Sequence, residues 1–250
     1  MVPNDVKLVP WTHRRAVLGP TPVTADLRDA QAVAAAFAST SPSLVIHSAV
    51  ALDVASIVDA TRNVVNGASH AGAEVVYIST DAVFSGDGRP VDESARPDPI
   101  WEYGRWKAEA EELVLRGQAG SAVVRLPLVV SLSPPDRTVE RIRQGAVEFL
   151  PTHWFHDETR QPAMAVDVAQ AIWRIALLDS RDRSGTWHLP GPERLSRYEI
   201  AQRVAAALRL DAGSIVSAKT PPDAVRPPHI DMLGERARSQ IGWTPARILI

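Results

Sequence analysis

Short apolar runs alternate along most of the chain with longer segments that are rich in alanine, glutamate and leucine. The apolar runs carry β-branched and aromatic residues and are followed by turn residues, which is typical of buried strands. Ser196 and Glu199 form a capping box ahead of the last alanine-rich segment, and we expect Asp167 to cap the one before it. The pattern predicts strands at residues 6–9, 22–25, 44–49, 74–79, 121–126 and 186–189. It predicts helices at residues 30–38, 54–71, 107–115, 168–178 and 197–210. A tight turn is predicted at residues 86–90.

The alternation of strands and helices predicts an α/β fold with a doubly wound, Rossmann-like parallel sheet. The run at residues 44–49 is uninterrupted and suits a central strand covered on both faces. Its last residues, Ser48 and Ala49, are small and would let a cofactor approach the backbone. We expect residues 1–126 to form a nucleotide-binding part and residues 127–250, where many of the prolines lie, to form a small substrate-binding lobe interleaved with it.

The composition is that of an ordinary soluble globular protein, with 45% apolar and 22% charged residues. A net charge of -2 offers no electrostatic attraction to nucleic acid or to an anionic membrane. The absence of cysteine excludes disulfides, thiolate metal sites and cysteine nucleophiles. No apolar run approaches 18 residues, and Asp5 and Lys7 stand where a signal peptide would need its apolar core, so we expect a cytoplasmic protein.

Tyr103 and Lys107 stand four residues apart at the start of a predicted helix and therefore share one of its faces. A phenol has a pKa of about 10 and is a poor acid or base at pH 7, but a nearby ammonium group lowers that pKa. The hydroxyl of Thr80, at the end of the strand at 74–79, would hold a carbonyl oxygen beside the phenol. The three residues predict a proton-transfer site for reducing a ketone or oxidising an alcohol.

Two motifs carry a resemblance to a known family: Ser-Thr-Asp-x-Val-Phe-x-Gly at residues 79–86 and Tyr-Gly-x-x-Lys at residues 103–107. They resemble the extended short-chain dehydrogenases/reductases, and within them the dTDP-4-dehydrorhamnose reductase branch of sugar-nucleotide reductases. The resemblance implies Thr80, Tyr103 and Lys107 as a catalytic trio. It also implies NADP or NAD as cofactor, with Lys107 holding the nicotinamide ribose.

Two positions depart from this branch. The branch usually has tyrosine near the substrate where this chain has Ala82, and it usually has asparagine at the end of a central strand where this chain has His47. A single histidine at such a place is more often a hydrogen-bonded structural residue than a catalyst. We therefore expect His47 to be structural.

Several residues near the N-terminus are candidates for binding the cofactor. His13 and Arg14 follow the first predicted strand and would favour NADP by holding an adenosine 2′-phosphate; a solvated basic loop is the alternative. The turn after the second strand resembles the Asp-hydrophobic-x-Asp turn of the reductases, which assigns Asp26 and Leu27 to the adenine. Asp29, in the same turn, is expected to cap the following helix.

The candidates for binding the substrate lie in the second half of the chain, where looser matches to the branch extend from residue 161 to residue 243. The resemblance places Gln161 near the substrate. Arg226, in a proline-flanked loop, would clamp a pyrophosphate bidentately, or is an ordinary exposed arginine. His153 and His156 have two acids beside them but lack the spacing of a metal site, so we expect no metal.

One expected feature is missing from the N-terminal part. A dinucleotide-binding fold of this kind begins with a strand, Gly-x-x-Gly-x-x-Gly and a helix, yet Gly19 is the only glycine before Gly67. That first strand is central, so the strands at 6–9 and 22–25 would lack their bridge to the strand at 44–49 and the Rossmann-like sheet would be incomplete. Either the native protein has about 25–35 further residues upstream, or the chain is a natural remnant that binds no dinucleotide in the usual way.

The sequence thus predicts an NAD(P)H-dependent reductase of a 4-keto sugar nucleotide. One alternative is a non-catalytic regulatory or binding protein on the same scaffold, which a missing glycine loop would permit. Another is a sugar-nucleotide epimerase or dehydratase, for which Asp81 is present but Ala82 offers no second acid. The expected partner is a small-molecule sugar nucleotide, with no nucleic acid and no membrane, and a homodimer is a possible assembly.

Overall fold

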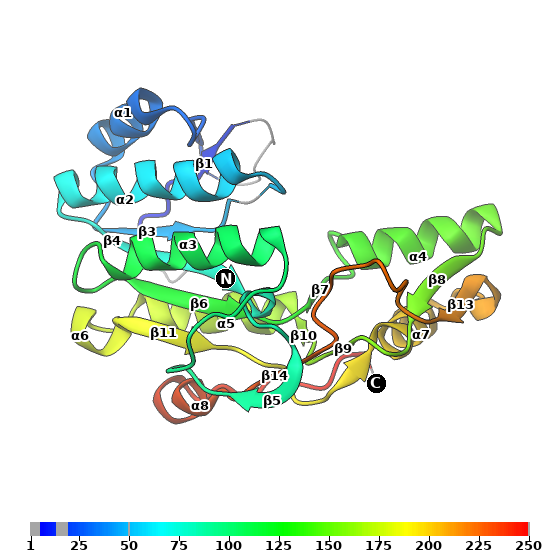
Figure 1. Cartoon of the computed structure of the whole chain (residues 1–250). Helices are drawn as coiled ribbons and strands as arrows, with labels where there is room; N and C mark the ends of the chain where they lie inside the picture. Colours follow the sequence, from blue (N-terminus) through cyan, green and yellow to red (C-terminus); the bar gives the residue numbers. More distant parts are fainter. Residues whose placement is uncertain (1–5, 14–19, 50, 250) are drawn as a thin grey trace. The chain divides into compact units, whose positions relative to one another are not determined.

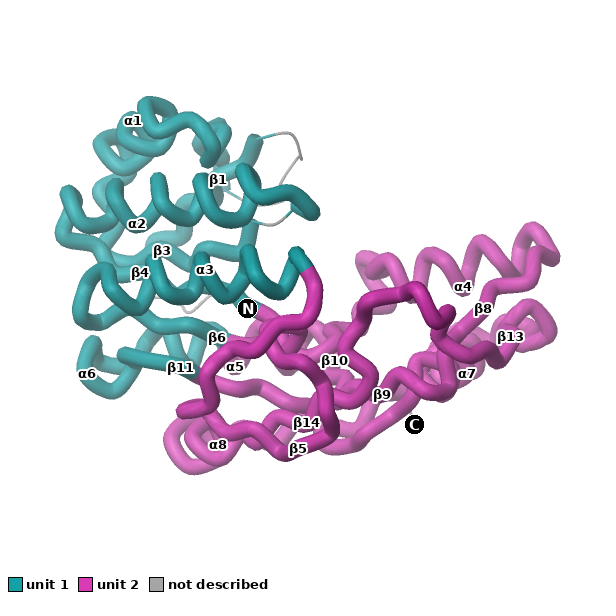
Figure 2. The backbone as a smooth tube through the Cα atoms, viewed as in Figure 1, with its two compact units in different colours: residues 1–79, 102–124, 172–186 teal, residues 80–101, 125–171, 187–250 magenta. Residues whose placement is uncertain are grey.

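The structure is a computed structural model that describes residues 6–13, 20–49 and 51–249 (Figure 1). The chain forms two compact units and passes between them several times (Figure 2). Each unit has a hydrophobic core of its own. Unit 1 consists of residues 1–79, 102–124 and 172–186, and unit 2 of residues 80–101, 125–171 and 187–250.

A four-stranded sheet lies mostly in unit 1, although the last residues of three of its strands, from Thr80, Arg125 and Trp187 onward, belong to unit 2. Its strands, in sheet order, are β11 (Gly185–His188), β6 (Ala122–Leu126), β4 (Glu74–Thr80) and β3 (Leu44–His47). The last two pair in parallel, with Leu44 opposite Glu74 and His47 opposite Tyr77. The middle of β4 is an apolar run that is buried from Val75 to Tyr77, as the pattern of the sequence predicts.

Helices pack on this sheet and complete the core of unit 1. They are α1 (Ala30–Thr40), the π-helical turn η1 (Ala55–Asp59), α2 (Ala60–Ala71), α3 (Glu102–Leu115), the end of α5 (Ala165–Ala176) and α6 (Ser180–Arg183). In Figure 1, α2 and α3 run side by side. The Asp29 side chain caps α1 by accepting the backbone N–H groups of Gln31 and Ala32, as predicted. Gly72 ends α2 with φ of 67°, a conformation that glycine adopts without steric cost.

Two short strands near the N-terminus form a sheet of their own, β1 (Trp11–Thr12) paired in parallel with β2 (Val23–Thr24). Within the part of the chain that the structure describes, no strand joins this pair to β3, as the missing central strand predicts. The predicted strand at 6–9 is wrong, because the backbone pairing with β2 begins only at the Pro10 carbonyl, which accepts the Val23 N–H at 2.9 Å. Trp11 anchors β1 edge-to-face on Phe37, with ring centroids 5.0 Å apart.

Unit 2 contains shorter strands in three small sheets. The largest has the order β12 (Leu195–Ser196), β9 (Thr159–Arg160), β14 (His229–Met232) and β5 (Asp87–Val91). The other two pair β7 (Val129–Val130) with β10 (Ala163–Met164), and β8 (Thr152–Phe155) with β13 (Ile215–Ala218). The helices of unit 2 are α4 (Arg137–Glu148), the start of α5, α7 (Arg197–Leu208) and α8 (Glu235–Ile241).

Helices α4 and α7 pack together over the core of unit 2, which includes Ile142, Trp154 and Ile200. The predicted capping box of α7 is confirmed: the Ser196 hydroxyl accepts the Glu199 N–H, and the Glu199 carboxylate accepts the Ser196 N–H. Helix caps of this kind satisfy backbone groups that would otherwise lack a partner.

Two local predictions in unit 2 are wrong. Asp167 lies inside the first turn of α5 instead of capping it, and its carboxylate accepts the Ala246 N–H at 3.3 Å. Most of the predicted turn at 86–90 instead belongs to the strand β5, because β14 supplies a partner strand more than 140 residues further along the chain. In this pairing Asp87 lies opposite His229, and Val91 lies opposite Met232. Among the described residues, no helix is long and apolar enough to cross a membrane.

Candidate active site

One face of α3 in unit 1 carries Tyr103, Lys107 and Glu111, spaced four residues apart. Lys107 and Glu111 are each 2% exposed, and Tyr103 packs against the core with its side chain half-buried. The predicted helix starts five residues earlier than expected, at Glu102, so both members of the Tyr-x-x-x-Lys pair lie within it. The i,i+4 spacing therefore places the phenol and the amine on one helix face, as predicted.

The neighbouring strand β4 holds the amine of Lys107. Its Nζ donates a hydrogen bond to the Ile78 carbonyl at 2.7 Å and lies 4.0 Å from the centroid of the Tyr77 ring. Burial lowers the pKa of Lys107 to about 7, although the nearby charge of Glu111 opposes that shift. At neutral pH the amine is close to half-protonated, so a change in the charge around it changes its protonation state.

Glu111 is held by a serine from the same strand. The Ser79 hydroxyl donates to Glu111 Oε1 at 2.5 Å, and both side chains are buried. A buried carboxylate is unfavourable unless hydrogen bonds or opposite charge compensate it. Ser79 supplies the hydrogen bond, and Lys107, one helical turn away, supplies the opposite charge.

His47 lies at the end of β3 and is also part of this buried region. Its Nε2 lies 3.1 Å from the Thr61 hydroxyl, which itself donates to the Ile57 carbonyl at 2.5 Å. Because the Thr61 proton is used in that bond, Nε2 acts as the donor to Thr61. Burial, together with the charge of Lys107, lowers the pKa of His47 to about 3, so the ring is neutral. His47 is therefore buried and hydrogen-bonded, and its structural role stays a prediction.

Thr80 is the last residue of β4 and belongs to unit 2. Its hydroxyl caps the turn at Asp81–Val83: it accepts the Ala82 N–H at 3.2 Å and donates to Asp81 Oδ1 at 3.2 Å. Burial raises the pKa of Asp81, an effect that Arg160, with its Nε 3.7 Å away, partly opposes. The strand end thus presents a half-buried hydroxyl followed by a buried acid.

A buried carboxylate of unit 2, Glu158, binds several arginines, which sequence reasoning did not find. Arg226 pairs with it through two hydrogen bonds of 2.8 and 3.0 Å, and Arg160 lies 2.9 Å away. The Nε atom of Arg197 lies 3.9 Å from Oε1 of Glu158. Burial alone would raise the pKa of Glu158, but the three guanidinium groups outweigh it and the pKa lies below its usual value. The sequence showed Glu158 only beside two histidines, and no group of three metal-ligating residues occurs among the described residues.

Arg226 and Gln161, the two residues predicted to bind substrate, both have defined partners in unit 2. Arg226 is held by Glu158, so it is an oriented arginine whose side chain is still 37% exposed. The Gln161 amide donates to the Met232 carbonyl at 3.2 Å and accepts the Met232 N–H at 2.7 Å. This pair of bonds fixes Gln161 against β14.

Among the predicted cofactor residues, the structure brings His13 and Asp26 together in unit 1. His13 Nδ1 lies 3.7 Å from Asp26 Oδ2. The hydrogen-bonded Arg28 guanidinium holds the pKa of Asp26 well below its usual range. The Leu27 carbonyl accepts from Asn63 at 3.0 Å. The remaining predicted positions are Ser48 and Ala49, exposed just after β3, and Arg14, which lies outside the described residues.

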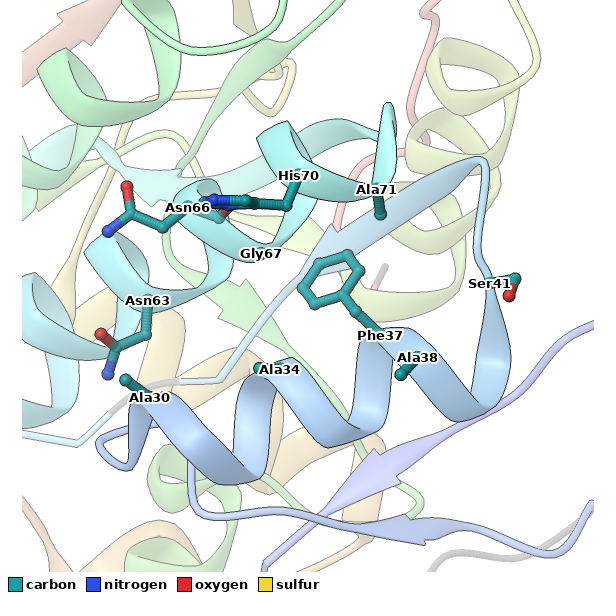
Figure 3. A pocket seen from close by; sticks show the side chains of 10 residues that line it. All are labelled: Ala30, Ala34, Phe37, Ala38, Ser41, Asn63, Asn66, Gly67, His70 and Ala71. Carbon is teal, nitrogen blue, oxygen red and sulfur yellow. The ribbon is translucent and has the colours of Figure 1, made fainter.

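A pocket of about 630 Å³ lies between α1 and α2 of unit 1 (Figure 3). The ring of Phe37 points into the space between the two helices, where Gly67 leaves room for it: a Cβ on that glycine would lie 2.5 Å from the ring. Four of the ten lining residues are alanines. Polar groups of the lining are used locally, such as the His70 Nδ1 that lies 2.7 Å from the Asn66 carbonyl. None of its lining residues lies on the face of α3 described above.

The parallel strands β3 and β4, flanked by α2 and α3, define unit 1 as a Rossmann-like α/β unit. Helix α3 of this unit presents the half-buried Tyr103 and the buried Lys107 on one face. Comparison with known proteins then identifies the family. The chain belongs to the RmlD substrate binding domain family, whose model matches residues 4–247.

Relatives of two different kinds share this family likeness. The methionine adenosyltransferase 2 subunit beta of Bos taurus is 32% identical over 169 residues, which are 63% of this chain and 49% of that protein. The chain therefore spans about half the length of this relative. The dTDP-4-dehydrorhamnose reductase of Mycobacterium tuberculosis (strain CDC 1551 / Oshkosh) is 28% identical over 204 residues, 78% of this chain and 66% of that protein.

A solved structure confirms the predicted fold. The dTDP-4-dehydrorhamnose reductase of Bacillus anthracis str. Ames, crystallised in complex with NADP, superposes with a TM-score of 0.74 at 24% identity and covers 84% of this chain and 78% of its own. The predicted α/β fold and the predicted resemblance to the dTDP-4-dehydrorhamnose reductase branch are both confirmed.

Proposed function

We propose that the chain reduces the carbonyl group of a 4-keto sugar nucleotide, with NADPH or NADH as the hydride donor. The observation that carries the proposal is the buried Lys107 amine on the same face of α3 as the Tyr103 phenol. A buried lysine with a strongly lowered pKa is unfavourable for stability, and such groups cluster at functional sites. The family membership of the chain supports the same reaction class.

Each residue of the trio has a role in this reaction. Tyr103 donates a proton to the carbonyl oxygen as hydride reaches the carbonyl carbon, so the ketone becomes an alcohol and the phenolate later recovers a proton from solvent. Charged Lys107 lowers the pKa of the phenol and so makes it a competent acid near neutral pH. The Thr80 hydroxyl orients the carbonyl oxygen, an assignment that rests on its position directly after Ser79 in the motif.

The cofactor, when bound, supplies the hydride. The Ile78 carbonyl takes one of the three N–H donors of the Lys107 ammonium, and we assign another to the nicotinamide ribose. No residue is assigned to the pyrophosphate, because the sequence contains no Gly-x-x-Gly-x-x-Gly. The other residues that we propose for the cofactor are His13, Arg14, Asp26, Leu27, Ser48 and Ala49.

For the substrate we propose Arg226 and Gln161 in unit 2, together with Thr80. A guanidinium that is already oriented by a carboxylate loses less conformational freedom when it binds a phosphate. Glu158 provides that orientation for Arg226. Ala82 is 6% exposed, so its small side chain is packed and does not project into solvent. We propose that the sugar-nucleotide phosphates bind at Arg226.

The proposal is tested by following NADPH oxidation with a dTDP-4-keto sugar, using the wild type and Tyr103→Phe. We expect the substitution to lower kcat by about 10²- to 10⁴-fold, because it removes only the proton donor. Tyr198→Phe is the matched control: Tyr198 lies on α7 in unit 2, where its hydroxyl accepts from Gln202 at 3.1 Å. Wild-type activity in Tyr103→Phe would overturn the assignment.

A second function is favoured by the relative whose name describes a subunit of methionine adenosyltransferase. In this alternative the chain is a non-catalytic subunit of another enzyme. Titration calorimetry with NADPH separates the two functions when it is combined with the turnover assay. Micromolar binding with turnover supports the reductase, whereas binding without turnover, with every dTDP-4-keto sugar tested, supports the subunit.

A further inference from the structure

One buried carboxylate of unit 1 has no part in the reaction as proposed above. Glu111 is 2% exposed, lies on α3 one turn beyond Lys107, and is two turns from Tyr103. Burying an ionised carboxylate is strongly unfavourable without compensation. Glu111 lies on the same face as the Tyr103–Lys107 pair. Because it is buried, its charge does not serve to keep the protein surface soluble and needs another explanation.

The contacts of Glu111 link it to the strand that leads to Thr80. Ser79 donates to Glu111 at 2.5 Å, and the preceding residue, Ile78, accepts the Lys107 amine at 2.7 Å. Adjacent residues of β4 thus hold the two opposite charges of α3, one each. This arrangement fixes both side chains in position before any ligand is present.

The other titratable groups packed around Lys107 do not supply a balancing negative charge. His47 from β3 is neutral, and burial raises the pKa of the Tyr77 phenol from β4, so it is neutral as well. On α2, Arg62 pairs at the surface with Asp59 at 2.5 Å and with Glu109 at 3.5 Å. On this face of α3 the buried negative charge is that of Glu111.

We propose that Glu111 is a positioning residue, whose carboxylate, fixed by Ser79, keeps the Lys107 amine charged beside Tyr103. This inference rests on the proposed function for its catalytic meaning. Because burial alone favours the neutral amine, a counter-charge on the same helix face is needed to keep a substantial fraction of it protonated near neutral pH. Loss of the carboxylate would leave Tyr103 beside a neutral amine, which does not lower the pKa of a phenol.

The direct test measures the protonation of Lys107 without any assay of activity. The chain has three lysines, so a ¹³C-lysine-labelled sample gives three amine signals, of which Lys107→Arg identifies one. Lys7 and Lys219 are exposed and provide reference signals in the same sample. We expect Glu111→Gln to shift the Lys107 titration midpoint down by about one pH unit or more, the effect of removing an opposite charge one helical turn away.

The matched control is Glu112→Gln, which makes the same chemical change one residue further along, at an exposed position that pairs with Arg116 at 2.9 Å. It should leave the Lys107 midpoint where it is in the wild type. An unchanged midpoint in Glu111→Gln overturns the inference. If that variant does not fold, Ser79→Ala gives the test: a smaller downward shift supports the inference, and no shift overturns it.

The catalytic meaning is read from the pH profile of NADPH oxidation. Glu111→Gln should lower kcat at pH 7 at least tenfold with a smaller effect on KM for the sugar nucleotide, and Glu111→Asp should recover part of the loss because it restores the charge. A Lys107 shift in a chain without reductase activity leaves the inference standing and overturns the proposed function. Reductase activity with no Lys107 shift overturns the inference alone.

Discussion

At the scale of single residues, the chain places an amine where burial disfavours its charge. Lys107 is 2% exposed, and its pKa falls to about 7 from an ordinary value of 10.5. The unfolded chain binds a proton at Lys107 up to about pH 10.5, whereas the folded chain releases it above about pH 7. Between these values the unfolded state holds more protons, so this residue makes the folded state more stable as pH rises.

Lys107→Met should remove this contribution to the pH dependence. Below about pH 7, where both states of the wild type are largely protonated, the variant avoids a desolvation cost on the order of 4 kcal/mol. The difference in free energy of unfolding between the variant and the wild type should therefore shrink from pH 7 to pH 10. Urea unfolding at several pH values measures it, with the exposed Lys219→Met as control. A constant difference between Lys107→Met and wild type would contradict the expectation.

At the scale of elements, local signals placed α1, α2, α3, α5 and α7 and the strands of the main sheet of unit 1. They did not give α4, α8 or most of the short strands of unit 2, where distant partner strands decided the outcome. The capping box at Ser196 correctly predicted the start of α7. In contrast, the residues from Asp87 to Val91 carry turn chemistry but form β5, because β14 pairs with them. Hydrogen-bonding to a partner strand outweighed the local preference for a turn.

The cap of α7 gives a prediction at this scale. Ser196→Ala removes the hydrogen bond that the Ser196 hydroxyl accepts from the Glu199 N–H at 3.1 Å, in a site that is 6% exposed. We expect a loss of about 1 kcal/mol in the free energy of unfolding. Ser239→Ala is the control, because Ser239 is exposed on α8 and bonds only to carbonyls of its own helix, at 2.9 and 3.1 Å. If urea unfolding showed the same loss of free energy of unfolding in both variants, the cap would not contribute to stability as expected.

At the scale of the whole molecule, each unit buries a histidine in its neutral form. His47 in unit 1 and His188 in unit 2 both have a pKa of about 3, mainly because burial disfavours their charged forms. His188 is fixed by Arg125, at 3.2 Å from its Nε2, and by the Leu233 carbonyl at 3.0 Å. Both units are therefore expected to respond to acid in the same direction.

Because the folded pKa lies below the ordinary 6.5, the unfolded state binds a proton at each histidine between pH 6.5 and pH 3 and the folded state does not. Stability is lost as pH falls through this window, by on the order of 4 kcal/mol per histidine, against total stabilities of about 5–15 kcal/mol. We expect His47→Asn to shift the acid unfolding of the chain to lower pH, as followed by tryptophan fluorescence. The exposed His70→Asn is the control and should leave it unchanged.

The sequence by itself determined the α/β class, the family resemblance and the Tyr-x-x-x-Lys face of α3, because each follows from the order of residues along the chain and requires no knowledge of which distant groups meet. The spacing of Tyr103 and Lys107 alone puts them on one face of a helix. The tertiary structure decided the rest: the pairing of β5 with β14, the arginines around Glu158, and the bond from Ser79 to Glu111. Apart from Arg160, which is a near neighbour of Glu158 in the chain, these contacts join groups far apart in sequence, as with Ser79 and Glu111 at 32 positions. No local pattern specifies which distant groups will meet. The face of α3 was predicted from its own spacing, but the burial that gives Lys107 its unusual acidity comes from the strands and helices packed around it.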